Sequence, residues 1–407
     1  MMRAPDAANS LRRGGGLLLG LALVLAGRAE AQTAPAAGQR ISGSVRATAT
    51  YDSNVAGGDQ LVASLRNLEP SDVTYDFGGS VSFLLPSSRQ ELVISASADA
   101  LRHANNPSLN AENYSVTAGD RARIGPCGLS LSAQYSHQQS LIQDLSLPVT
   151  NNTQRQESIT GSTSCGTGAF FAGVSGGISK STNSATSQGF VGSETKNGSV
   201  SAGYQNTTLG QLSVGAQYST VRYDGISPTL SALNLQGIDQ YGVLLDYSRK
   251  IGHRLSGSVG VSYNHLKSPG GVLSSDSVGS HAALKYAVSP RLGLSVAYTL
   301  SNDASPTVNA NYVRNESFSA TGTYKLNRAI DLHLGASTTN ANYRGGIVTP
   351  VLQIRNSRST SVFGGASMRV GRKIVVTLDA NHSDRSADIA AFDFGSDQVT
   401  LGISSSF

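Results

Sequence analysis

The strongest constraint on this chain is a two-residue alternation of apolar and small polar side chains. In RLSGSVGVSYNH, residues 254–265, one side carries Leu255, Val261 and Tyr263, and the opposite side consists of Ser, Gly and Asn. A period of two is typical of a β-strand with one polar face. About eighteen such segments follow one another, too many for a single sandwich, and none keeps a helical period beyond a turn or two.

The connections between these segments alternate in length. Some are tight turns such as GPCG, GTG, TTLG, IGH, SPR, NRA and GRK, whereas the others are long and polar. Short turns at one end and long loops at the other are typical of outer-membrane barrels. Tyrosines fall near both ends of the strands, which predicts an aromatic girdle at each membrane interface: Tyr51, Tyr135, Tyr218, Tyr263 and Tyr298 before long loops, and Tyr204, Tyr247, Tyr286 and Tyr324 before tight turns.

These patterns predict an all-β protein, a closed antiparallel transmembrane β-barrel over residues 40–407. We expect about eighteen strands, with sixteen as the alternative, short periplasmic turns and long extracellular loops. The barrel would lie in the outer membrane of a Gram-negative bacterium, in contact with its lipid. Because lipid leaves no backbone group unpaired, residues 397–407 must pair antiparallel with the first strand, predicted at Arg40–Asp52.

The first residues have a different character. Arg12 and Arg13 precede an apolar run that ends in an A-x-A site, which predicts a signal peptide over 1–31, cleaved before Gln32. A short periplasmic segment, 32–39, would follow, too small for the plug of a TonB-dependent receptor. The formal net charge is only +5 and no basic block occurs, so nucleic acid is not an expected partner.

A barrel of this size is too wide for its own side chains to fill, and the small polar face predicts a water-filled lumen. Charges on that face either tune permeation by their local field or are merely solvated. The pore-lining candidates are Arg121, Arg123, Asp246, Lys285, Lys325, Asp331, His333, Arg369, Lys373 and Asp379. A constriction would come from a loop, with 141–156 as the candidate, unless that segment is an ordinary surface loop. The same register turns Asp120 toward lipid, which suggests a bulge or a boundary error.

Cys127 and Cys165 are the two cysteines of the chain. Cys127 lies in the turn before the fifth strand and Cys165 ends the sixth, so a hairpin would bring both to the same periplasmic rim. Because the periplasm is oxidising, we predict a disulfide. Two free thiols out of register are the alternative.

Catalytic chemistry has no support in the sequence. The seven His residues are scattered, without a GxSxG elbow or an HExxH pair. Metal-ligand spacing is also absent. We therefore predict no enzyme activity, no metal and no cofactor.

Two resemblances add to this interpretation. The terminal Phe407 resembles the aromatic signature that outer-membrane proteins present to the barrel-assembly machinery, which implies that machinery as a partner. RATATYDSNV (46–55), YSRKIGHRLSGSVGVSY (247–263) and YAVSPRLGLSVAY (286–298) resemble a family of β-barrel porins encoded beside exopolysaccharide synthesis and export genes.

The second resemblance implies an outer-membrane barrel that passes a polysaccharide or polar solutes, with polysaccharide export components as partners. It transfers no catalytic residues. We accordingly predict a passive channel for polar solutes or for an exopolysaccharide. A nonspecific diffusion porin and a structural or adhesive barrel without transport stay open as alternatives.

Overall fold

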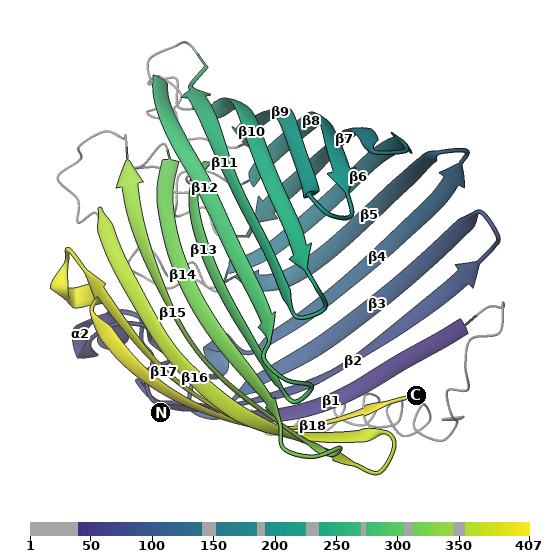
Figure 1. Ribbon diagram of the computed structural model, residues 1–407. Coiled ribbons are helices and arrows are strands. Elements are labelled where there is room, and N and C mark those ends of the chain that lie inside the picture. Colours follow the sequence, from purple (N-terminus) through teal and green to yellow (C-terminus); the bar gives the residue numbers. More distant parts are fainter. Residues whose placement is uncertain are drawn as a thin grey trace, which may run out of the picture.

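The strands of this chain form one closed barrel (Figure 1). The computed structural model describes residues 40–140, 152–184, 192–224, 236–269, 274–304, 312–344 and 355–407. The predicted signal peptide and the segment 32–39 lie outside the described residues. Each strand pairs antiparallel with the next, and β1 pairs with β18. The closed antiparallel barrel is therefore confirmed, with eighteen strands rather than sixteen.

The first nine strands are β1 (Arg40–Asp52), β2 (Asp72–Pro86), β3 (Gln90–His103), β4 (Ala111–Ile124), β5 (Cys127–Ser140), β6 (Asn152–Thr167), β7 (Phe170–Asn183), β8 (Gly192–Asn206) and β9 (Gly210–Asp224). The other nine are β10 (Gly237–Ile251), β11 (Leu255–Lys267), β12 (Ser274–Ala287), β13 (Leu292–Ala304), β14 (Tyr312–Lys325), β15 (Ile330–Arg344), β16 (Asn356–Val370), β17 (Ile374–Ala387) and β18 (Phe394–Ser406).

Tight turns close the barrel at one end only. Gly125 and Gly168 open two-residue turns with φ of 58° and 64°, a left-handed conformation that favours glycine. The connections at the other end are longer, from six residues at 268–273 and 388–393 to nineteen at 53–71. Since outer-membrane barrels keep their tight turns in the periplasm, this end is the periplasmic one.

The seam between β1 and β18 follows the predicted pairing of the two ends, with Ser44 opposite Ser406 and Asp52 opposite Gln398. Beyond β18, Phe407 exchanges two backbone hydrogen bonds with Gly43, at N···O distances of 3.0 and 2.9 Å. The Phe407 ring lies against Gly43, where a Cβ would clash with it. Glycine at position 43 therefore lets the last aromatic ring lie across the first strand.

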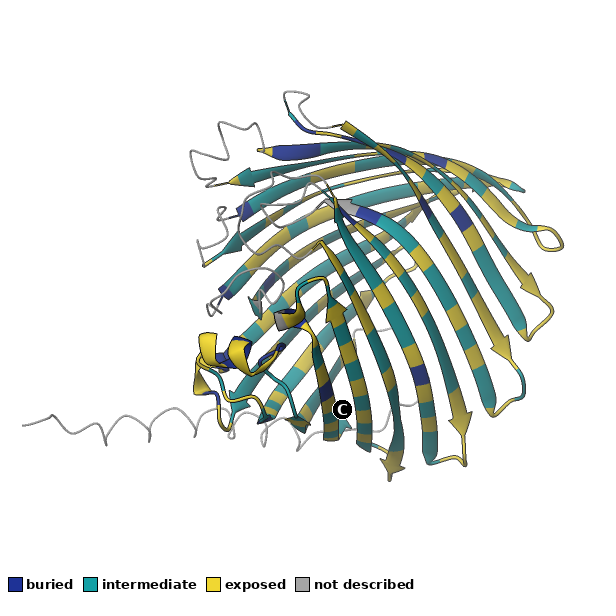
Figure 2. Ribbon diagram, turned by 90° about the vertical axis from the view of Figure 1, so that its left-hand side faces the viewer, coloured by how far each residue is buried: buried dark blue, intermediate teal, exposed yellow. Residues whose placement is uncertain are grey.

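The two faces of each strand differ as the alternation predicts. Large apolar residues are exposed on the outward face, for example Val243, Leu245 and Tyr247 on β10. Figure 2 shows the resulting bands of intermediate and exposed residues, with few buried residues in the barrel wall. Tyr218 and Tyr241 are in contact on neighbouring strands, with ring centroids 5.0 Å apart and ring planes tilted by 40°, within the extracellular girdle. The apolar side chains thus face lipid rather than a packed interior.

A small packed cluster covers part of the extracellular rim. The connection after β1 contains helix α2 (Gln60–Leu65), whose N-terminus is capped by Asp59 accepting from the Val62 amide at 2.8 Å. Its buried Val62 joins other buried apolar residues from the connections that contain the 3₁₀ turns η1 (Pro107–Leu109) and η2 (Ala390–Phe392). Within the described residues, no helix has the length and apolar character needed to cross a membrane.

Asp120 faces outward, as the register predicts, but neither the bulge nor the boundary error that the sequence suggested is present at this position. The pairing of β4 with β3 and with β5 runs without interruption through Asp120, opposite Leu92 and Leu131. The Gln90 amide donates to both Asp120 carboxylate oxygens, at 3.1 and 3.0 Å. Two hydrogen bonds near the periplasmic rim offset the exposure of this carboxylate to lipid.

Candidate functional site

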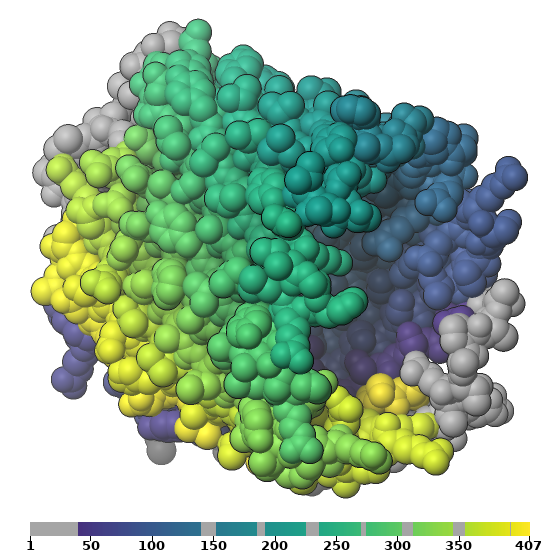
Figure 3. Space-filling view, viewed as in Figure 1, coloured from purple at the N-terminus to yellow at the C-terminus, as the bar shows by residue number. Residues whose placement is uncertain are grey.

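The candidate site is the lumen itself. Figure 3 shows the molecule hollowed on the side of the tight turns, between strands from both halves of the chain. The lumen-facing positions alternate with the apolar outward ones and carry mostly Ser, Thr, Gly, Asn and Gln. Ionisable side chains on this wall occur in a recurring arrangement, in which an aspartate meets a histidine or an arginine across a glycine on the strand between them.

The first of these arrangements joins β10, β11 and β12. Asp246 lies opposite Gly260, which lies opposite His281. His281 Nε2 and Asp246 Oδ1 are 3.3 Å apart, and a Cβ at Gly260 would clash with both side chains. The missing side chain of Gly260 therefore leaves the space in which the carboxylate meets the imidazole.

The second arrangement repeats the first on β15, β16 and β17. His333 lies opposite Gly365, which lies opposite Asp379. The His333 Nε2 to Asp379 Oδ1 distance is 2.9 Å, and a Cβ at Gly365 would again clash with the aspartate. Both His333 and Asp379 were predicted to line the pore, and the structure brings them together.

The third arrangement, on β1, β2 and β3, is one that the sequence analysis missed. Arg46 lies opposite Gly78, and Gly78 lies opposite Asp99. The Arg46 guanidinium contacts Asp99 Oδ1 at 2.7 Å and Asp76 Oδ2 at 3.2 Å. The alternation in β1 could have placed Arg46 on the lumen face, because it shares a face with Thr48 and opposes the apolar face, but it could not have identified Asp99 as the partner.

The remaining pore-lining candidates lie near the periplasmic rim. Arg121 is 3.8 Å from Glu91, and Arg369 is 3.4 Å from Asp331. Arg123 and Lys325 are exposed toward the end of their strands. Lys373 lies in the turn between β16 and β17 rather than on a strand.

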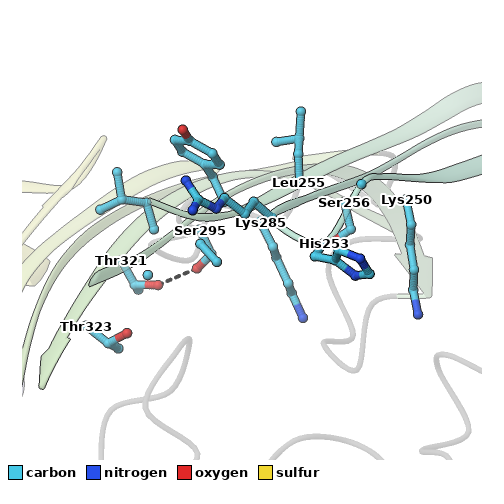
Figure 4. A pocket seen from close by; sticks show the side chains of 14 residues that line it. Lys250, His253, Leu255, Ser256, Lys285, Ser295, Thr321 and Thr323 are labelled. Atoms are coloured by element: carbon cyan, nitrogen blue, oxygen red, sulfur yellow. Dashed lines mark hydrogen bonds between the residues drawn. The ribbon is translucent and has the colours of Figure 1, made fainter. Parts of the chain in front are cut away.

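Lys285 lies in a lumen-side hollow of about 570 Å³ near the turn between β10 and β11. In Figure 4 its side chain points into the hollow together with Lys250 and His253, whereas Leu255 points the other way. The hollow also includes Ser256, Ser295, Thr321 and Thr323. Of these residues, only Lys285 was predicted to line the pore.

The wall formed by β5–β9, here called the neutral wall, has a different composition. Across its described residues no charged side chain lies on the lumen face. Hydroxyl groups pair across strands instead, Ser130 with Ser162 and Ser175 with Ser199, each at an Oγ···Oγ distance of 2.7 Å. We call the rest of the barrel, β10–β18 with β1–β4, the ionic wall.

The neutral wall contains the two cysteines. Cys127 begins β5, directly opposite Cys165 near the end of β6. Their Cα atoms are 4.0 Å apart, well inside the 7 Å limit for a bridge, and a disulfide joins them. It crosses the outward face at the periplasmic rim. For the predicted constriction loop, residues 141–151 lie outside the described residues and 152–156 form the start of β6.

Comparisons with known proteins agree with this architecture. A family model described as Gram-negative porin matches residues 128–346. The fold is similar to the FrpB iron transporter from Neisseria meningitidis, with a TM-score of 0.52, 9% identity and coverage of 90% of this chain and 82% of that one. It is also similar to the siderophore receptor PirA from Acinetobacter baumannii, with a TM-score of 0.50, 7% identity and coverage of 90% and 80%. At these identities the likeness concerns the fold alone. No curated protein matches the sequence.

Proposed function

This chain belongs to the Gram-negative porin family, and from that premise we propose that its barrel is a passive channel through which polar solutes, or an exopolysaccharide, cross the outer membrane. The family supports transport rather than catalysis. An eighteen-stranded barrel with a small polar lining supports a wide, hydrated lumen. The finer part of the proposal, passage of a hydroxylated polymer, rests on the neutral wall.

The neutral wall is suited to uncharged, hydroxyl-rich solutes. Its lumen-facing Ser, Thr, Asn and Gln side chains both donate and accept hydrogen bonds, so they can exchange partners with sugar hydroxyls as well as with water. No fixed charge on the described part of its lumen face favours ions of either sign. On the ionic wall, most charges are held in pairs, which shortens the reach of their field into the lumen. Together these features support weak ion selectivity and tolerance of neutral polymers.

Single-channel conductance of the refolded protein tests the proposal, with neutral dextran fragments added to one side of a planar bilayer. We expect large, weakly selective steps that flicker as fragments enter. The variant Gln134→Leu/Gln217→Leu removes two amides from the middle of the neutral wall and should shorten the fragment-induced closures by about threefold, the loss expected for one net hydrogen bond.

The matched control is Gln205→Leu/Gln211→Leu, the same change at a register pair beside the periplasmic turn of the same wall. Its closures should keep their wild-type duration. Steps without any dextran flicker would favour a nonspecific diffusion porin. Silence from a folded barrel would contradict transport and favour a structural or adhesive role.

We also propose two kinds of partner. The C-terminal strand with Phe407 would be the segment that the barrel-assembly machinery binds, which the position of its ring over Gly43 at the closing seam supports. Polysaccharide export components would meet the periplasmic end if the solute is an exopolysaccharide. The leader over 1–31, with export across the inner membrane, is part of the same proposal.

A further inference from the structure

The hollow near the turn between β10 and β11 contains one continuous row of lumen-facing side chains. Lys250 on β10 lies opposite Ser256 on β11, and Ser256 lies opposite Lys285 on β12. The row continues through Ser295 on β13 to Thr321 on β14. Lysine and serine thus alternate over four neighbouring strands, and a threonine ends the row.

In the described part of the chain, the two lysines have no ionic partner, unlike the acidic and basic side chains that meet across Gly260, Gly365 and Gly78. Within the described ranges, no carboxylate lies within 4 Å of the ammonium of Lys250 or Lys285, and both side chains are exposed. Asp246 is the acidic residue on the lumen face of β10, four positions from Lys250, and it is engaged by His281 at 3.3 Å. Two cationic groups therefore face the hollow without a counter-charge from the wall.

The spacing of the row lets both lysines act on one group. Neighbouring strands lie about 4.8 Å apart, so the Lys250 and Lys285 backbones are about 10 Å from each other with Ser256 between them. Two flexible four-carbon side chains can converge over that distance. Figure 4 shows both ammonium groups and the His253 ring directed into the same space.

The hydroxyl groups complete the donor set. Ser295 Oγ and Thr321 Oγ1 are 2.5 Å apart and hydrogen bonded to each other, so one of the two protons is left to donate elsewhere. Ser256 and Thr323 add further hydroxyls to the lining. Several donors and three positive charges, since Arg254 also lines the hollow, with no carboxylate among the lining residues, form an environment for an anion that accepts several hydrogen bonds.

We propose that the row from Lys250 to Thr321 is a binding site for an oxyanion, a phosphate or carboxylate group carried by a solute at the periplasmic mouth of the lumen. This site is separate from the neutral wall proposed for uncharged solutes. It rests on the proposed function in one respect, because the anion would reach it through the channel. Free phosphate and an acidic sugar share the chemistry that the row recognises.

Binding and block by inorganic phosphate test the site in the refolded full chain. Equilibrium dialysis against radiolabelled phosphate measures binding without requiring transport, and half-block of the single-channel current measures occupancy in the lumen. In Lys250→Gln/Lys285→Gln we expect both affinities to fall by about tenfold or more, because two charge-assisted contacts are lost. The preference for chloride over potassium should fall with them.

The matched control is Lys180→Gln/Lys196→Gln, which removes two lysines from the outward face of β7 and β8. It should leave phosphate binding and block unchanged. A second experiment adds oligogalacturonate fragments to the bilayer. If these fragments block the current and the lysine variant relieves the block, the site is assigned to acidic sugars. If only phosphate blocks the current, the site is assigned to the free anion.

The two proposals fail in different ways. Dextran flicker together with phosphate affinity that is equal in wild type and in the lysine variant would overturn the oxyanion site and leave the channel intact. If wild-type protein bound no phosphate at a concentration of about 10 mM, the dissociation constant would be too high for a specific site, and the oxyanion proposal would also be overturned. A folded barrel that never conducts but loses phosphate binding in the variant would contradict the channel and support the site.

Discussion

The neutral wall and the ionic wall share the same antiparallel strand architecture, but different contacts between side chains stabilise them. Across the described part of β5–β9, the lumen face has no ion pair, and a disulfide between Cys127 and Cys165 crosses the outward face. On the ionic wall, Asp246 and His281 meet across Gly260, and the same arrangement recurs twice. Small residues therefore serve two purposes in this barrel. On one wall they leave the surface uncharged, and on the other they make room for an aspartate to meet a histidine or an arginine.

Removing the disulfide should give the largest effect and should act on the neutral wall alone. The bridge spans 38 positions, and closing a loop of that length stabilises a fold by about 2–4 kcal/mol. We expect Cys127→Ser/Cys165→Ser to lower the free energy of unfolding by about that amount in urea titrations in detergent. The loss should be the same at low and high salt. A strong salt dependence would contradict the division between the two walls.

Filling the space between Asp246 and His281 should have a smaller effect, confined to the ionic wall. In Gly260→Ala the added methyl group would clash with both partners, so we expect the free energy of unfolding to fall by about 1–3 kcal/mol. The comparison variant is Gly128→Ala, a lumen-facing glycine of the neutral wall where a Cβ would meet Ser164 Oγ at an ordinary 3.8 Å. Equal losses in the two variants would show that the pair across Gly260 adds nothing.

Releasing the paired charges should affect permeation more than stability. Arg46→Gln leaves Asp76 and Asp99 unpaired on the lumen face, so the reversal potential in a KCl gradient should shift toward potassium by about twofold in permeability ratio. Arg102→Gln, which removes a comparable outward-facing pair with Glu112, provides the control. An unchanged reversal potential in Arg46→Gln would mean that these charges lie too far from the ion path to matter.

Much of this architecture could be predicted from local patterns. Alternation alone located β1 at Arg40–Asp52 and placed Asp246, His333 and Asp379 on the lumen face, because a period of two fixes which side chains share a face. The outward position of Asp120 followed from the same register. Alternation could not predict how Asp120 is tolerated there, because the Gln90 amide that donates to its carboxylate comes from the neighbouring strand.

Pairs across three strands were beyond local patterns. Asp246 and His281 are 35 positions apart, and their contact depends on the register of both hairpins between them and on the glycine in the middle. Arg46 and Asp99 are 53 positions apart, and their contact likewise depends on the register of two strand pairs. The position of Lys373 was missed because strand ends depend on turn geometry more than on alternation.

The seam has a consequence for how the barrel is completed. Gly43 and Phe407 meet only after every intervening hairpin has been placed, so their contact has nearly the largest sequence separation that the described chain permits. Hairpins form from local contacts and are fast, whereas joining the first strand to the last requires closing a loop of the entire domain. We therefore expect closure of the seam to be the last step in the folding of this barrel. Until it happens, the edges of β1 and β18 are open to pairing with another chain.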